Sequence, residues 1–356
     1  MTTSWRQIGL LYGIGVVAAG QLGIVPPLVT ALQRDLDLSL AGAGVAVSAI
    51  TLVGAVLGLP AGDWSERIGH VRALRLGIAV MAVAAAICAI ATDGAVLLLR
   101  GGDMRKSMSS GPRHQSLALS LWGTFVPTGI ALAGLATAAL ANHVGWRAIF
   151  LADAVLLAAV LGIAALMPQL ASQPAGGNRQ VSSANALLTA VPLAVAFFCF
   201  ALLFLALAGL LPVNLVDMRK LPASEAGQFV AIATSLGIVG SLATGWMMRR
   251  GAPPGRLILA GMATSTALAA LGLFSLVPTH AAVACFALSF AVGGLVPAAV
   301  FASVPLVAPG PHTVGPINGL IAQTGSLGSL VGPPMLALWV EHIGWSTAAT
   351  PLLAIA

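Results

Sequence analysis

Residues 62–72 read Gly62-Asp-Trp-Ser-Glu66-Arg67-Ile-Gly69-His-Val-Arg72 and lie between two long apolar stretches. This charged segment stands out because the 356-residue chain avoids charge almost everywhere. Only 7% of its residues are Asp, Glu, Lys or Arg, 58% are hydrophobic, and the mean hydropathy is +0.99. So few charges cannot cover the surface of a water-soluble protein of this size. The composition therefore predicts an all-α polytopic membrane protein.

Stretches that are long and apolar enough to span a bilayer, about 20 residues, recur along the chain. Two further apolar pieces, residues 95–99 and 345–356, are too short to cross alone. We therefore expect about 10 to 12 transmembrane segments, the first of them an uncleaved span. The runs occupy residues 8–32, 40–62, 73–92, 117–141, 147–167, 187–212, 225–247, 256–277, 281–308 and 316–340.

The longest polar connector, residues 168–186, divides the chain into an N-terminal bundle (1–167) and a C-terminal bundle (187–356). A twelve-span path with a cytoplasmic N-terminus places most basic residues on the cytoplasmic side, as the positive-inside rule requires. Arg34, Arg147, Arg219 and Lys220 then face outward. The sequence thus predicts a cytoplasmic linker and a cytoplasmic N-terminus.

The two bundles share an internal repeat. At an offset of 183, Gly62 pairs with Gly245 and Arg67 with Arg250; at an offset of 199, Gly145-Trp146 pairs with Gly344-Trp345. The repeat predicts that the chain has two pseudo-symmetric halves. The change of offset means that the first half lacks about 16 residues, roughly 24 Å of helix, near its fourth span.

The fourth span is accordingly expected to be defective, and the last span to be truncated. Two explanations stay open for the polar segment 100–114. Residues 88–105 could form a half-length crossing that the rest of the protein shields from lipid. Alternatively, the chain is a truncated or degenerate copy that does not transport.

The segment Gly62-x-x-x-Glu66-Arg67-x-Gly69-x-x-Arg72 resembles the signature loop of the major facilitator superfamily, in which the acidic position is usually Asp. The step Gly145-Trp146-Arg147 also resembles that family. The resemblance implies two rocking bundles around a central substrate site, and a conformational latch between them. The implied latch residues are Gly62, Glu66, Arg67, Gly69 and Arg72, with Arg249 and Arg250 in the second half.

Few polar or aromatic side chains could serve a substrate within the apolar runs. Gln21 lies near the middle of the first span, which lines the cavity in the resembling family, and Gln323 lies in the eleventh; interhelical hydrogen bonding is the alternative for Gln21. Phe197 and Phe301 could form apolar cavity walls or simply pack. Asp153 is the only carboxylate well inside an apolar run, which makes it a coupling candidate, with pairing to Arg147 as the alternative.

The sequence does not indicate an enzyme, a cofactor or a metal site. The six histidines and Cys88, Cys199 and Cys285 have no metal-ligand spacing, and the basic residues form no nucleic-acid patch. We expect a monomeric permease of the bacterial inner (plasma) membrane. Its partners would be the lipid bilayer, a small-molecule substrate and, through Asp153, protons. The substrate, the transport direction and the coupling ion have no signal in the sequence.

We predict that Glu66→Gln abolishes transport, because the amide cannot replace the negative charge that would pair with basic groups and helix termini of the other half. Uptake into cells that express equal amounts of both forms measures the effect. Transport at the wild-type rate would refute the latch role of Glu66.

Overall fold

The structure, a computed structural model of the chain, describes residues 5–56, 68, 70–90, 115–166, 183–310 and 313–355. These residues form helices joined by short turns, with no β-strand among them, which confirms the all-α fold. The helices are α1 (Trp5–Ile24), η1 (Pro26–Leu28), α2 (Val29–Asp35), α3 (Leu40–Ser48), η2 (Ala49–Thr51), α5 (His70–Ala89), α6 (Gln115–Ala165), α7 (Ser183–Asp217), α8 (Ala223–Ser235), α9 (Gly237–Arg249), α10 (Pro254–Leu273), α11 (Thr279–Gly293), α12 (Leu295–Val307), α13 (Val314–Ile343), η5 (Trp345–Thr347) and α14 (Ala349–Ile355).

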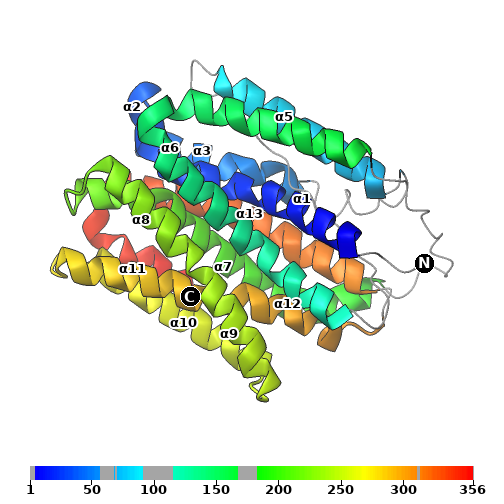
Figure 1. The fold of residues 1–356 in the computed structure, drawn as a ribbon. Helices are drawn as coiled ribbons and strands as arrows, with labels where there is room; N and C mark the ends of the chain where they lie inside the picture. The colour runs from blue at the N-terminus through cyan, green and yellow to red at the C-terminus, as the bar shows by residue number, and fades with distance from the viewer. Residues whose placement is uncertain are drawn as a thin grey trace.

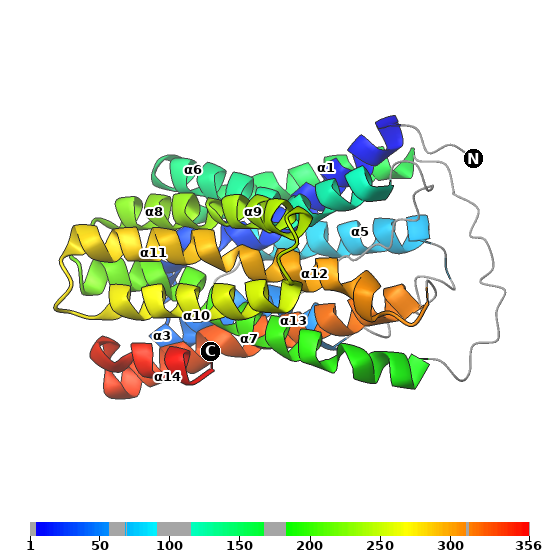
Figure 2. The ribbon, with the colours of Figure 1, turned by 90° about the horizontal axis from the view of Figure 1, so that it is seen from below.

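The long helices lie side by side in one bundle (Figures 1 and 2). Among the described residues, seven segments have the length and composition to cross a membrane, so the chain is a multi-pass membrane protein. They are Gly9–Asp35, Val71–Ala89, His143–Ala165, Leu187–Asp217, Ala223–Arg249, Pro254–Leu273 and Thr279–Val307.

Helix α13 is 30 residues long, yet it is not among these seven segments. It contains five glycines and three prolines, and it packs along α7 and against α3 rather than facing outward along its whole length. Ile317, Ile321 and Leu336 are fully buried. Small residues allow this close helix packing, at the cost of apolar character.

The bundle has two ends, which we name after one residue at each. The Gly145 end carries the bend of α6, the turn after α2, the connection between α10 and α11, and α14 (Figure 2). The Arg249 end carries the starts of α1, α5 and α7 and the end of α9.

The backbone repeats between the halves at the offsets found in the sequence. Within the described residues, Asp37 (φ 48°) and Lys220 (φ 57°) are the only non-glycine residues with positive φ, and they are 183 positions apart. Gly145 (φ 72°, ψ 162°) at the bend of α6 and Gly344 (φ 98°, ψ 166°) directly after the end of α13 have similar backbone conformations, 199 positions apart. The same turns therefore recur at both predicted offsets.

The predicted domain boundaries stay a prediction, with one difference in detail. Helix α7 begins at Ser183, four residues inside the connector expected at 168–186. Residues 91–114, which include most of the anomalous fourth-span region, lie outside the described residues. Helix α14, at the place of the last span, has seven residues.

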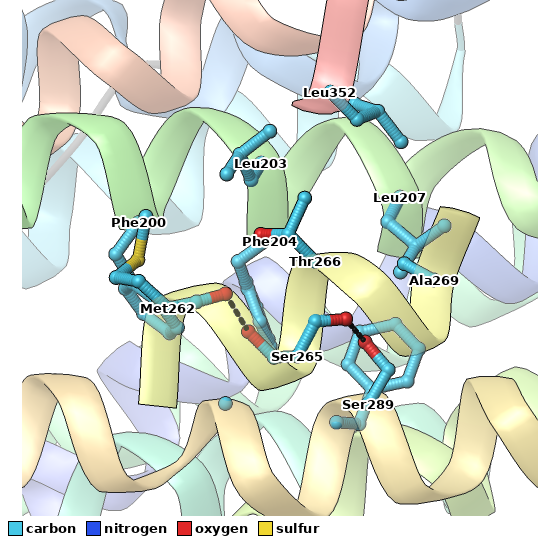
Figure 3. Close-up of a pocket in the computed structure, with 12 residues that line it drawn as sticks. Phe200, Leu203, Phe204, Leu207, Met262, Ser265, Thr266, Ala269, Ser289 and Leu352 are labelled. Carbon is cyan, nitrogen blue, oxygen red and sulfur yellow. Dashed lines mark hydrogen bonds between the residues drawn. The ribbon is translucent and has the colours of Figure 1, made fainter. Parts of the chain in front are cut away.

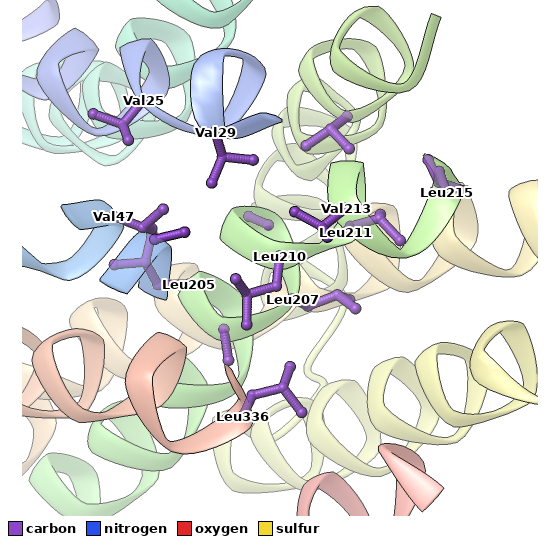
Figure 4. Close-up of a cluster of buried hydrophobic side chains, with 14 of the residues drawn as sticks. Val25, Val29, Val47, Leu205, Leu207, Leu210, Leu211, Val213, Leu215 and Leu336 are labelled. Atoms are coloured by element: carbon purple, nitrogen blue, oxygen red, sulfur yellow. The ribbon is translucent and has the colours of Figure 1, made fainter. Parts of the chain in front are cut away.

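The halves meet near the Gly145 end, where α3 packs on α13 and α6 on α8. A Cβ atom on Gly44 would lie 2.7 Å from the carbonyl oxygen of Pro333, so any larger residue would push α3 away from α13. The largest buried apolar cluster also joins both halves, bringing Val29 and Val47 together with Leu210 and Leu336 (Figure 4). Close packing therefore seals this end.

We predict that Gly145→Ala destabilises the protein by about 1–3 kcal/mol, because its backbone conformation is one that only glycine adopts without strain. Gly162→Ala is the matched control. It lies in the same helix with open space around its Cβ position, and it should stabilise by up to about 1 kcal/mol through helix propensity. Thermal unfolding of the purified protein measures both; equal shifts in Tm would contradict the assignment of strain to Gly145.

Candidate functional site

Gln21 and Asp153, which the sequence singled out separately, contact each other in the interior of the first half. Gln21 Nε2 donates a hydrogen bond to Asp153 Oδ1 at 2.7 Å. The side chains are 3% and 7% exposed, so the contact is almost fully shielded. It links α1 to the part of α6 that follows Gly145. Gln21 therefore makes an interhelical hydrogen bond, which is the alternative to a substrate contact.

Close helix packing positions this pair. A Cβ atom on Gly129 would lie 2.3 Å from the carbonyl oxygen of Val16, so α1 and the first part of α6 touch backbone to backbone. The bend at Gly145 then returns α6 toward α1 and brings Asp153 opposite Gln21. At the Gly145 end, Trp146 Nε1 donates to Asp35 Oδ2 at 2.8 Å and holds the returning helix against α2.

A buried carboxylate beside an amide can respond to protonation. The amide NH₂ group donates to a carboxylate, whereas the amide oxygen can accept from a carboxylic acid. A change of protonation at Asp153 would therefore reorganise the contact between α1 and α6. Ionisable groups at membrane depth are costly, which makes such a pair a functional candidate.

The remaining predicted substrate residues lie elsewhere. Gln323 Nε2 donates to the carbonyl oxygen of Ala55 at 2.9 Å, so it joins α13 to the first half. The rings of Phe197 and Phe301 meet edge to face at 5.1 Å, and Phe197 lies against Gly325 of α13. This geometry resembles packing more than a cavity wall, and neither ring lines the two pockets described below.

The predicted latch residues are only partly described. Arg72 lies exposed in the first turn of α5, and Arg249 and Arg250 lie exposed where α9 ends. The Arg250 guanidinium is 3.9 Å from the centre of the Trp246 ring. Gly62, Glu66, Arg67 and Gly69 lie outside the described residues, so the latch stays a prediction.

Two pockets contain residues that the sequence did not single out. The central pocket lies between the halves, and the second-half pocket lies within the C-terminal bundle (Figure 3); the space between their lining atoms, open solvent included, is about 280 and 400 Å³. The central pocket is lined by Leu22, Gly23, Pro26, Pro27, Ile130, Gly134, Phe204, Leu205, Ala208, Val230, Ala231 and Thr234. The second-half pocket is lined by Phe200, Leu203, Phe204, Leu207, Met262, Ser265, Thr266, Ala269, Ser289, Phe290, Gly293 and Leu352.

No cluster of His, Cys, Asp or Glu side chains in the described part of the chain could hold a metal ion. The three cysteines carry no disulfide: Cys88 is buried, and Cys199 and Cys285 are half-buried. The only sequence signal for the pocket residues is a few hydroxyl side chains within apolar runs, which are common in membrane helices.

We predict that the Gln21 and Asp153 side chains are energetically coupled. Gln21→Leu should destabilise by about 1–3 kcal/mol, because it removes a donor from a buried carboxylate. The double variant Gln21→Leu/Asp153→Leu should lose less stability than the two single variants lose in sum, with a coupling free energy of about 0.5–3 kcal/mol. Thermal unfolding of the four forms measures this, and strictly additive effects would show that the contact has no energetic weight.

Comparison with known proteins identifies the fold and the family. A bacterial homologue of the human lysosomal transporter Spinster, inward-facing and occupied, has a TM-score of 0.74 at 14% identity; the match covers 100% of this chain and 90% of that one. The Escherichia coli fucose:proton symporter has a TM-score of 0.66 at 16% identity, covering 99% and 97%. These two likenesses concern the fold alone.

Two curated relatives match in sequence. The gallate transporter of Pseudomonas putida is 25% identical over 388 aligned positions, which cover 94% of this chain and 86% of that protein. A Haemophilus influenzae protein, provisionally named for metabolite transport, is 33% identical over 162 residues, 41% of this chain and 39% of its own length. The profile of the Major Facilitator Superfamily matches residues 11–101 and 107–333, and the chain therefore belongs to that family of transporters.

Proposed function

We propose that the chain is a secondary active transporter that moves a small organic solute across the bacterial inner membrane by alternating access between its two halves. A proton or solute gradient would supply the energy. The names of the two sequence relatives support this class of substrate, since one is a gallate transporter and the other is provisionally named for metabolite transport. Nothing in the described site suggests enzyme chemistry.

The observation that carries the proposal is the closure of the Gly145 end by contacts between the halves that can open again. The backbone N–H of Ala41 donates to Glu341 Oε1 at 2.8 Å, so a carboxylate of α13 occupies the N-terminus of α3. Helix N-termini favour such a negative partner. Gln323 adds one further bond between the halves, farther from the Gly145 end, since it lies in the first third of α13.

These contacts are individually weak. A single hydrogen bond contributes roughly 0.5–3 kcal/mol, and the rest of the seal is van der Waals packing of small residues such as Gly44. A seal of this kind can break and re-form, as a bistable contact between rocking bundles must.

The charge distribution supports a cytoplasmic Arg249 end. Arg72, Arg75, Arg249, Arg250 and Arg256 lie at or near that end in the described chain, where the N-terminal helix also begins. Four basic residues lie toward the Gly145 end, Arg34, Arg147, Arg219 and Lys220. The positive-inside rule therefore favours a cytoplasmic N-terminus and a seal on the outer side.

The assignment of roles follows the geometry. Asp153, held by Gln21, is the proposed coupling site, and Gln21 acts through Asp153 rather than on the substrate. Glu66 and Arg67 with Arg249 and Arg250 form the proposed latch on the cytoplasmic side. In this scheme the central pocket, where α1, α6, α7 and α8 meet, receives the solute.

Transport by alternating access requires the α6–α8 contact to open, which a reversible disulfide can test. A Cβ atom on Gly134 would lie 3.5 Å from the Cβ of Ala231, within the usual range for a disulfide. We predict that Gly134→Cys/Ala231→Cys, in a background without the native cysteines, loses uptake on oxidation and regains it on reduction. Uptake into proteoliposomes is followed with a labelled panel that includes gallate and fucose.

The matched control is each single variant, Gly134→Cys or Ala231→Cys, which carries only one thiol and cannot form the disulfide. Because a single variant does not link the halves, oxidation should leave uptake unchanged. Full uptake by the oxidised Gly134–Ala231 pair would refute alternating access between these halves. A panel that accumulates no more than protein-free liposomes would count against transport itself.

A further inference from the structure

The repeat places the second-half pocket at the position that the Gln21–Asp153 contact occupies in the first half. The offset of 183 carries Gln21 to Phe204, and the offset of 199 carries Asp153 to Leu352. Both counterparts line the second-half pocket (Figure 3). The same place in the fold thus holds a hydrogen-bonded polar pair in one half and an apolar pocket in the other.

Phe204 lines the central pocket as well as the second-half pocket. Its ring stacks on Phe200 at 5.5 Å and meets Phe290 edge to face at 5.6 Å. The side chains leave only narrow free space in each pocket in this conformation. Phe204 is therefore a shared wall, and turning its ring about χ1 would join the two spaces.

Three of the four hydroxyl groups that line the pockets already donate to a backbone carbonyl oxygen. Ser265 Oγ donates to the carbonyl oxygen of Met262 at 3.1 Å, and Ser289 Oγ donates to that of Ser265 at 2.7 Å (Figure 3). In the central pocket, Thr234 Oγ1 donates to the carbonyl oxygen of Val230 at 2.8 Å. A hydroxyl has one proton to give, so these three oxygens can now only accept, whereas Thr266, the fourth hydroxyl, keeps its proton.

The charge of the lining limits the ligand further. Neither pocket has a charged side chain among the described residues that line it. A carboxylate would lose its hydration and find three acceptors and a single hydroxyl donor, Thr266, there, which is unfavourable. Rings in stacked and edge-to-face contact, by contrast, suit another aromatic ring. The lining favours an uncharged aromatic molecule that brings its own O–H or N–H donor.

We infer that Phe204 is a movable partition, and that the two pockets together bind an uncharged aromatic solute carrying a hydrogen-bond donor. Phe204 sets the largest ring system that enters. This assignment rests on the proposed transport function and names its substrate class. The assigned ligand must carry a hydrogen-bond donor and no negative charge. This requirement distinguishes the chain from carriers of aromatic carboxylates.

Calorimetric titration of the full chain in lipid nanodiscs tests the ligand class, with empty nanodiscs subtracting partition into lipid. The probes are phenol, anisole and benzoate, which share one ring and differ in donor and charge. Wild-type protein should bind phenol at least about tenfold more tightly than anisole, because anisole leaves the acceptors unpaired. Benzoate should not bind. Binding of benzoate or anisole at the phenol affinity, or no binding of phenol, overturns the assignment.

The partition is tested with 2-naphthol, which has a second ring. Phe204→Ala should bind it about tenfold more tightly than the wild type, since it removes the wall that excludes the second ring. Phe301→Ala is the matched control, because Phe301 belongs to the same aromatic cluster but lines neither pocket. An equal gain in both variants, or none in Phe204→Ala, overturns the role of Phe204.

Phe204→Leu, a smaller disturbance, keeps the test decisive if Phe204→Ala does not fold, and it should give a gain of the same direction. The outcome is separable from the transport proposal. A chain that binds phenol selectively but moves no solute in proteoliposomes refutes transport and leaves the site standing. A chain that accumulates solutes but binds no phenol refutes the site alone.

Discussion

Backbone-to-backbone packing of helices is the constraint on which the rest of this structure depends. Inside a bilayer, water is absent, so every backbone polar group is satisfied within its own helix, and the helices gain little hydrophobic stabilisation from touching one another. Contact must come from close van der Waals packing and a few hydrogen bonds. Within the first half, Gly129 packs against Val16 in this way. Between the halves, Gly44 packs against Pro333. Both the Gln21–Asp153 contact and the closure of the Gly145 end require these approaches.

The two halves keep the same turns while their interiors differ. Backbone conformation is held at Asp37 and Lys220, and at Gly145 and Gly344, where the chain must reverse or bend. Side chains between the helices are freer to change, provided that polar groups find partners. The first half satisfies a carboxylate with an amide, and the second fills the equivalent space with aromatic rings. A repeated scaffold can thus hold a hydrogen-bonded polar pair in one half and an apolar pocket in the other.

Much of the fold could be predicted because bilayer thickness and hydropathy leave a mark on every span. The long apolar runs, the all-α architecture and the Gly-Trp steps of the repeat all follow from the sequence alone. Asp153 stands out in the sequence for the same reason, since a carboxylate in an apolar run is rare. These features depend on one residue type or one local pattern, which is what a sequence displays.

The partners of the polar residues could not be predicted. Gln21 and Asp153 lie 132 positions apart, and Ala41 and Glu341 lie 300 apart, so no local pattern links them. The pockets could not be predicted from the sequence for a different reason. In a soluble protein, alternation of apolar and polar residues marks the buried face, but a membrane helix is apolar toward lipid and toward its neighbours alike. Phe197 and Phe204 therefore look equivalent in the sequence, although only Phe204 lines the pockets.

The composition of α13 has a consequence for how the chain is assembled. A nascent helix partitions from the translocation channel into lipid according to its own apolar character, and α13, with five glycines and three prolines, falls short of the other long helices. Its small residues are suited to α7 and α3, which are synthesised earlier. Insertion of α13 should therefore wait on helices already in the membrane, which makes its integration a late, partner-dependent step of biogenesis.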